Sequence, residues 1–292
     1  MRILLVSTAA IALSGCSMLG FGSGGHSYGP SYGHGYAPQT SYNPCKAKTP
    51  KPQGCMVMSQ WNLEGAVGQE YMVGGDFTTP GDVTPIPGTD LAAVSMQDAY
   101  DPGLRLELGL SKALNPNRKF TVMGSYTKAE GQDVSIASQT GVPANQIRGQ
   151  ASDYKSYGIE AGLRQYFTPT AAPLFGSLRP YVEGRVGAAN VDDISLTNAR
   201  TITGGATAPF NGGNIDMYEG GWIATGAGLV GVEAPIFKRA TLGLETGLRY
   251  RSALNADQTD LSAGGTQPLL TGLNNGSENW SVPVTLRARY RF

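Results

Sequence analysis

Apolar and polar residues alternate with a period of two along much of the chain beyond residue 56. The clearest example is residues 104–110, where every even position is Leu and every odd position is polar or small. Successive side chains of a β-strand point to opposite faces, so only a strand brings these leucines to one face. The last example, residues 280–292, has Arg287, Arg289 and Arg291 on its polar face. The pattern predicts strands with one apolar and one polar face.

Eight such stretches occur, each near the length of a strand that crosses a membrane. The sixth is ambiguous, because Ile223 and Leu229 compete with Trp222 and Val230 for the apolar face. The predicted strands cover residues 61–67, 104–110, 120–127, 157–167, 180–188, 222–232, 241–250 and 280–292.

The polar faces of these strands combine acidic residues with arginines and carry almost no Lys. They hold Glu64, Glu107, Glu160, Glu183 and Glu245 with Arg105, Arg164, Arg185, Arg249, Arg287 and Arg289. A soluble β-sandwich also alternates, but its polar face is solvated and carries Lys freely. Enclosed charges are retained cheaply only when they are partnered. We expect an all-β fold, an eight-stranded antiparallel transmembrane β-barrel over residues 55–292 with this network in its lumen; a solvated sandwich is the alternative.

The connections between the predicted strands alternate in length. The long ones cover residues 69–103, 128–155, 190–221 and 251–279, and the shorter ones cover residues 111–119, 168–179 and 234–240. Transmembrane barrels have long extracellular loops and short periplasmic turns. Both ends of the barrel are therefore expected on the periplasmic side.

Composition narrows the function classes. Charged residues make up only 15% of the chain, which is low for a soluble surface, and the 22 basic residues are balanced by 22 acidic ones. This balance leaves no basic footprint for nucleic acid, so no nucleic-acid partner is expected.

Residues 1–15 have the features of a signal peptide, with one Arg followed by a mostly apolar run. The run is shorter than the roughly 20 apolar residues that a membrane-spanning helix needs. The sequence Leu13-Ser14-Gly15-Cys16 resembles the bacterial lipobox, and this resemblance implies a diacylglyceryl group on Cys16. Ser17 is compatible with transfer of such a lipoprotein to the outer membrane. An ordinary signal peptide cleaved elsewhere is the alternative.

Residues 16–54 would then be the lipidated Cys and a linker rich in Gly, Tyr, Ser and Pro, which cannot bury enough apolar surface to offset its ordering entropy. We expect a disordered tether. Its two histidines, His26 and His34, make a poor metal-ligand set because no carboxylates accompany them. Docking of the tether on peptidoglycan is another hypothesis. Cys45 and Cys55 are expected to pair in a disulfide if the chain is exported, with free thiols as the alternative.

Aromatic residues fall near the ends of the predicted strands, as the interface belts of a membrane protein require. The predicted extracellular belt holds Tyr126, Tyr157, Trp222, Tyr250 and Trp280, and the periplasmic belt holds Phe120, Tyr166, Phe167, Phe237, Tyr290 and Phe292. Over residues 56–292 the chain resembles the OmpA-type and OmpX-type eight-stranded barrels. The ending with Tyr290 and Phe292 is similar to that family's C-terminal assembly signal, which implies recognition by the barrel insertion machinery. The chain departs from OmpA in that no peptidoglycan-binding domain is expected after the barrel.

An eight-stranded barrel has an interior just wide enough for side chains to fill. We therefore expect a plugged lumen and a structural or surface-interaction role in the outer membrane of a Gram-negative bacterium. A narrow porin-like channel is the first alternative. An outer-membrane lipid-modifying enzyme is the second; the barrel enzymes it would resemble use His-centred chemistry, and residues 56–292 contain no His. Neither an enzymatic activity nor a cofactor or metal is expected.

The long loops are the expected contact surface for an extracellular ligand or an envelope protein. Membrane lipid and lipopolysaccharide are the other expected partners of the barrel. Acidic loop residues could bind divalent cations that bridge lipopolysaccharide, although solvated carboxylates are the simpler reading. They are Asp76, Asp82, Asp90, Asp192 and Asp193.

Overall fold

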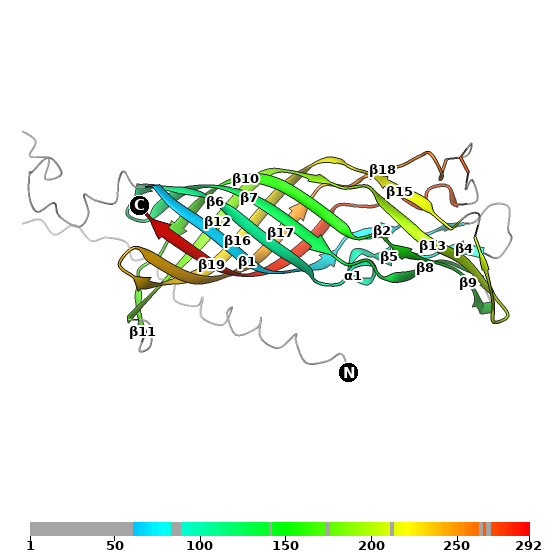
Figure 1. The fold of residues 1–292 in the computed structure, drawn as a ribbon, viewed down its shortest axis with the longest axis horizontal. Helices are drawn as coiled ribbons and strands as arrows, with labels where there is room; N and C mark the ends of the chain where they lie inside the picture. The colour runs from blue at the N-terminus through cyan, green and yellow to red at the C-terminus, as the bar shows by residue number, and fades with distance from the viewer. Residues whose placement is uncertain are drawn as a thin grey trace, which may run out of the picture. The chain divides into compact units, whose positions relative to one another are not determined.

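The computed structural model describes residues 61–82, 89–139, 142–172, 176–210, 213–262, 265–266 and 270–292. Eight long strands form a closed antiparallel barrel (Figure 1), which confirms the predicted fold. They are β1 (Trp61–Gly74), β6 (Gly103–Asn115), β7 (Arg118–Ala129), β10 (Tyr154–Tyr166), β12 (Gly176–Val191), β16 (Gly221–Phe237), β17 (Ala240–Arg251) and β19 (Asn279–Arg291). Each of these strands pairs with its neighbour along the chain, and β19 closes the barrel on β1 with Glu64 opposite Arg289.

The outer surface of the barrel is apolar. Leu108, Val186 and Leu244 are 65%, 70% and 61% exposed, and they belong to a continuous set of outward Leu, Val and Ile side chains. Soluble proteins rarely expose an apolar surface of this extent. Lipid chains cover such a surface, so the barrel is of the transmembrane type.

The ambiguous sixth strand, β16, follows the same rule as the others. Trp222 and Val230 face outward and are 63% and 47% exposed, whereas Ile223 and Leu229 are buried. Pairing with β12 and β17 fixes this choice, because the neighbouring strands set which face of each residue points to lipid.

The short connections lie at one end of the barrel, which we call the turn end. Residues 116–117 join β6 to β7, and residues 238–239 join β16 to β17. The third short connection holds β11 (Thr170–Ala172), which pairs with the start of β12. The C-terminus lies at the same end (Figure 1), where the amide of Phe292 donates to the carbonyl of Trp61.

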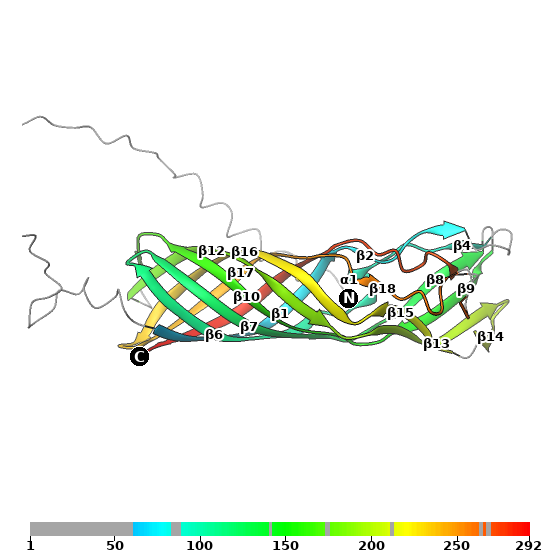
Figure 2. The same cartoon turned by 90° about the horizontal axis from the view of Figure 1, so that it is seen from above.

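The four long connections lie at the opposite end and build a second β-structure, which we call the head (residues 75–102, 130–153, 192–220 and 252–278; Figure 2). Its main sheet runs β18-β15-β13-β9-β8-β4-β3, with β14 paired to β13 and β2 to β5. These strands are β2 (Asp76–Thr78), β3 (Gly81–Asp82), β4 (Thr89–Leu91), β5 (Val94–Ser95), β8 (Asp133–Gln139), β9 (Val142–Ala151), β13 (Ile194–Thr203), β14 (Ala206–Pro209), β15 (Ile215–Glu219) and β18 (Asn255–Ala256).

The head differs from the loops expected from the sequence, because about half of its described residues lie in paired strands. Its alternation is interrupted: β8 and β9 change register between Ser135 and Ala137, where Ile136 and Ala137 are both buried. A bulge of this kind breaks the period-two pattern that reveals a strand in the sequence.

The interior of the head is an apolar core. Phe77, Ile136 and Leu196 are fully buried, and Phe77 packs edge-on against Tyr100 with ring centroids 5.8 Å apart. The fourth connection adds Leu261, Leu270 and Leu273, also fully buried. The head therefore has the packed interior of a folded domain.

Helix is scarce in the described part of the chain. The α-helix α1 (Met96–Ala99) is capped by Ser95, whose hydroxyl accepts from the amide of Asp98 at 3.2 Å. Within the same residues, no helix has the length and apolar character needed to cross a membrane.

Candidate functional site

The lumen of the barrel is a network of buried ion pairs. All eleven residues of the predicted network lie in it and each takes part in at least one ion pair. They reach the lumen because they occupy alternate positions on strands whose other positions face lipid. Except for Arg289, whose side chain is 12% exposed, these side chains are at most 3% exposed.

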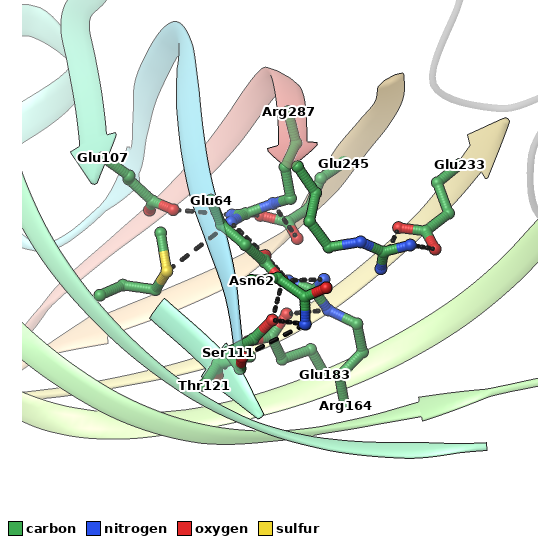
Figure 3. Close-up of polar contacts among 12 residues, drawn as sticks. Asn62, Glu64, Glu107, Ser111, Thr121, Arg164, Glu183, Glu233, Glu245 and Arg287 are labelled. Carbon is green, nitrogen blue, oxygen red and sulfur yellow. Dashed lines mark hydrogen bonds and ion pairs between the residues drawn. The ribbon is translucent and has the colours of Figure 1, made fainter. Parts of the chain in front are cut away.

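Glu64 and Arg164 form a bidentate pair across the barrel (Figure 3). The guanidinium nitrogens Nη2 and Nη1 of Arg164 lie 2.9 Å and 3.2 Å from Glu64 Oε2 and Oε1. Arg164 Nε also donates to Glu183 Oε2 at 2.7 Å. The hydroxyls of Ser111 and Thr121 donate to Glu64 and Glu183 at 2.5 Å and 2.7 Å. Both carboxylates thus have charged and neutral donors.

Arg287 and Arg185 connect this pair to the middle of the lumen. Arg287 Nη2 donates to Glu107 Oε2 at 2.7 Å and to Glu245 Oε1 at 2.6 Å, and its Nη1 lies 3.4 Å from Glu64 Oε2 (Figure 3). Arg185 donates from Nε to Glu183 and from Nη1 to Glu107, at 2.8 Å and 2.9 Å. These two arginines and the carboxylates that they contact lie on β1, β6, β12, β17 and β19, so two guanidinium groups link five strands.

Glu70 anchors the part of the network nearest the head. Its Oε1 accepts from Arg251 Nη2 at 2.7 Å and from the Ser281 hydroxyl at 2.5 Å. Its Oε2 lies 3.1 Å from Arg105 Nη1 and accepts from the Thr127 hydroxyl at 3.0 Å. These partners come from four strands, so Glu70 ties the barrel together below the head.

Tyr166 lies inside the lumen at the turn end and not in the lipid-facing belt, which corrects the prediction. It is 1% exposed, and its hydroxyl accepts from Arg289 Nη1 at 2.6 Å. Arg289 also pairs with Glu233, at 2.8 Å between Nη2 and Oε1. Adjacent residues of a strand face opposite sides, so Phe167, which is 44% exposed, and Tyr166 cannot both face lipid.

Four further charged residues buried inside the barrel were not predicted from the sequence: Glu70, Lys119, Glu233 and Arg251. Each lies just beyond a predicted strand end. Glu70 has the same parity as Glu64 in β1, and Arg251 has the same parity as Arg249 in β17. Continuing the alternation past the apolar stretch would have found them, because the strands extend beyond the membrane-facing band.

This arrangement is suited to closing the lumen. A buried charge is costly unless partnered, and in this network the carboxylates are tied to arginines or hydroxyls. A cavity of about 10 Å³ remains among Arg105, Glu160, Thr225 and Arg249, which is room for about one water molecule. Arg105 Nη2, Glu160 Oε2 and Thr225 Oγ1 are without a protein hydrogen-bond partner there. The hydrogen-bonding capacity of these atoms suits one bridging water.

The other predicted sites lie apart from the lumen. Tyr290 and Phe292 are 45% and 62% exposed at the turn end, with their rings edge-on at 5.8 Å between centroids. Cys16, Cys45 and Cys55, with the signal peptide and the linker, lie outside the described residues.

Two of the acidic residues suggested for cation binding have hydrogen-bond donors in the head. Asp76 accepts from the Ser277 hydroxyl at 3.1 Å, and Asp193 accepts from the Gly220 amide at 2.6 Å. Across the described ranges, no group of three or more His, Cys, Asp or Glu side chains is arranged to hold a metal ion. Asp192 and Asp193 do line an open cavity of about 610 Å³ beside Asp153 and Lys155.

Asp133 is the centre of an ion-pair cluster on the head. Arg148 Nε lies 3.1 Å from its Oδ1, and Arg200 contacts its Oδ2. Burial opposes the charged form, but the hydrogen bonds from the two arginines outweigh it, and the pKa of Asp133 lies below its usual value.

Asp216 has the opposite environment. Partial burial, followed by the nearby carboxylates of Asp260, Asp257 and Asp193, raises its pKa above the usual value. Like-charge repulsion therefore acts across β15 and the fourth connection.

No protein-family model matches the chain, and no curated protein sequence matches it. Solved structures with a similar fold include Neisserial surface protein A (12% identity, TM-score 0.40), which covers 80% of this chain and 97% of its own. Others are the outer membrane protease OmpT of Escherichia coli (10%, TM-score 0.44, 80% and 97%) and Ail, the attachment invasion locus protein of Yersinia pestis (13%, TM-score 0.35, 80% and 99%). Each likeness concerns the fold alone.

Proposed function

We propose that the protein is a surface protein of the Gram-negative outer membrane that uses a plugged barrel to display the head outside the cell. The observation that carries the proposal is the apolar core of the head, with Phe77, Ile136 and Leu273 fully buried. Closing a barrel needs no such core. A folded head of this size supports a surface-interaction or structural role.

The orientation follows from the connections. Long connections are extracellular and short turns periplasmic in transmembrane barrels, which would place the head outside and the turn end in the periplasm. An epitope tag inserted at Gly204-Gly205, in an exposed turn of the head, should be labelled on intact cells. The same tag at Lys238-Arg239 should be labelled only after the outer membrane is permeabilised. The reverse pattern would refute the orientation.

Lipid attachment at Cys16 remains part of the proposal. A Cys16→Ala protein should lose metabolic labelling by palmitate while its barrel still shows heat-dependent mobility on gels. Recognition of the β19 ending by the insertion machinery is tested in the same assay, since Phe292→Ala should reduce the heat-modifiable fraction. Unchanged labelling or an unchanged folded fraction would contradict the respective claim.

The lumen supports a non-conducting barrel. Arg164, Arg185 and Arg287 are at most 3% exposed and cross-link opposite strands. Planar-bilayer recordings should show no large stable openings, and such openings would favour the narrow-channel alternative. We assign the barrel no catalytic role, because its carboxylates are held in ion pairs and residues 56–292 contain no His.

The interaction role is tested by a headless protein in which short turns replace the four long connections. Heat-modifiable migration is the control for a folded barrel. Loss of cell attachment to surfaces or other cells supports an interaction role, and increased detergent sensitivity supports a structural role. A headless strain that behaves as wild type in both assays would overturn the proposal.

A further inference from the structure

Charge is strongly divided along the barrel axis. Fifteen of the 22 acidic residues lie in the head ranges, which contain two basic residues, Arg148 and Arg200. The other seven acidic residues are glutamates of the lumen. The turn end therefore carries no Asp or Glu side chain on its outer rim.

Basic residues gather at this acid-free rim, and we call them the basic collar. They are Lys112, Arg118, Arg179, Lys238, Arg239 and Arg291. In the described part of the chain no ion pair is found for any of them. Lys112 and Arg179 lie over aromatic rings, and the arginines at positions 118, 179 and 291 donate to carbonyl or amide oxygens. Arg118 Nε donates to Gln165 at 2.7 Å, and Arg291 Nη2 donates to the carbonyl of Lys238 at 3.0 Å. The collar is thus an uncompensated positive surface.

The collar lies at the edge of the lipid-facing band. Lys112 is opposite Trp61 on one neighbouring strand and opposite Phe120 on the other. Its ammonium nitrogen is 5.4 Å from the Trp61 ring centroid, and Trp61 and Phe120 are 46% and 36% exposed. Aromatic side chains of this kind sit at the headgroup level of a membrane. Lys112 therefore projects into the layer that contains lipid phosphates.

We propose that the basic collar binds the phosphates of anionic phospholipids in the leaflet at the turn end. Positive charge at the rim, aromatic neighbours at headgroup depth and the lack of local acidic partners all fit this ligand. The opposite rim has outward Lys128 and Lys155, but Lys128 already pairs with Asp153 at 3.0 Å and acidic residues surround the pair. The preference for anionic lipid is therefore expected only at the turn end. It does not depend on what the head contacts, so it and the proposed function fail separately.

The three tryptophans provide a local test. Trp61 lies beside Lys112 of the collar, and Trp222 and Trp280 lie at the opposite rim. A full-length protein with Trp222→Phe and Trp280→Phe reports lipids next to the collar through quenching of Trp61 by brominated lipid. A second protein with Trp61→Phe and Trp280→Phe reports the opposite rim through Trp222. Both are placed in vesicles that contain brominated phosphatidylglycerol or brominated phosphatidylcholine.

Trp61 should be quenched preferentially by the anionic lipid, with relative binding at least about five-fold in its favour, since each basic residue near an anionic surface contributes about this factor. Substituting Lys112, Arg118, Lys238 and Arg239 with Gln should bring the ratio close to one. The matched control, Lys128→Gln with Lys155→Gln, should leave it unchanged. Trp222 should show little preference.

A Trp61 ratio near one, or a ratio unaffected by the collar substitutions, overturns the proposal. An equal fall of the Trp61 ratio in the control with Lys128→Gln and Lys155→Gln also overturns it, because the preference for anionic lipid would then be a general effect of charge. Salt provides a measurement without substitutions: raising the ionic strength must lower the Trp61 ratio, because it screens exposed charges. Collar-dependent sedimentation with purified peptidoglycan in the absence of lipid selectivity would assign the collar to that polymer instead.

Discussion

The barrel and the head are two regions built from paired strands, and their interiors are opposite in character. The barrel is apolar outside and charged inside, with Glu64 and Arg164 fully buried in its lumen; the head is filled by side chains such as Phe77 and Leu196. In lipid, an apolar side chain gains little by moving from the outer face to the interior, because lipid tails are as apolar as Leu. In water the same movement is strongly favourable. The surrounding medium thus explains why the interior of the barrel is charged and that of the head is apolar.

The largest expected effect comes from removing one charge of the lumen. Arg287→Met removes an arginine partner from each of Glu64, Glu107 and Glu245 at once and should destabilise the barrel by about 3–5 kcal/mol. Urea unfolding in detergent micelles, followed by heat-modifiable migration, measures this. Arg200→Met, which breaks a partly exposed ion pair of the head, is the control and should cost under about 1 kcal/mol. Equal costs would abolish the distinction between the two interiors.

The head should be sensitive to cavities. Ile136→Ala removes a fully buried side chain and should cost about 2–4 kcal/mol of head stability. Faster hydrogen exchange and proteolysis are expected in β8 and β9, while barrel migration stays unchanged. Exchange that increases equally in β1 and β19 would mean that the two parts unfold as one unit.

Two threonines of the lumen differ in whether their hydroxyl groups have a hydrogen-bond partner. Thr285 Oγ1 is buried without a hydrogen-bond partner, whereas Thr121 Oγ1 donates to Glu183. Thr285→Val should stabilise the barrel by about 1 kcal/mol, and Thr121→Val should destabilise it by about 1.5–3 kcal/mol. Both are measured by the urea midpoint, and a loss of stability in Thr285→Val would show that its hydroxyl is satisfied.

The smallest effect is a pH dependence in the head. The raised pKa of Asp216 means that its charged form is disfavoured in the folded head, so its destabilising effect is present above the folded pKa and disappears as pH falls below the unfolded value. Asp216→Asn should stabilise the head by only about a few tenths of a kcal/mol at neutral pH, because the side chain is exposed and solvent screens the repulsion. The gain should vanish under acidic conditions in hydrogen-exchange measurements; a gain that persists there has another origin.

Alternation determined the strands of the barrel and the residues of its lumen. Residues 104–110 and 280–292 are strands in the structure, and residues such as Glu64 and Arg287 lie inside because side-chain parity is a local property. The same alternation places Glu70 and Arg251 in the lumen. They were not predicted because each strand was expected to end where its apolar stretch ends.

The tertiary structure alone decided the partners and the head. Arg164 reaches Glu64 across 100 positions of sequence, and no local pattern encodes which guanidinium meets which carboxylate. The head could not be predicted from the sequence, because bulges interrupt the alternation of its strands. Its core also brings together residues from different connections, such as Phe77 and Tyr218. Side-chain direction is fixed by the chain itself, whereas register, barrel closure and the packing of distant connections are fixed only when the strands come together.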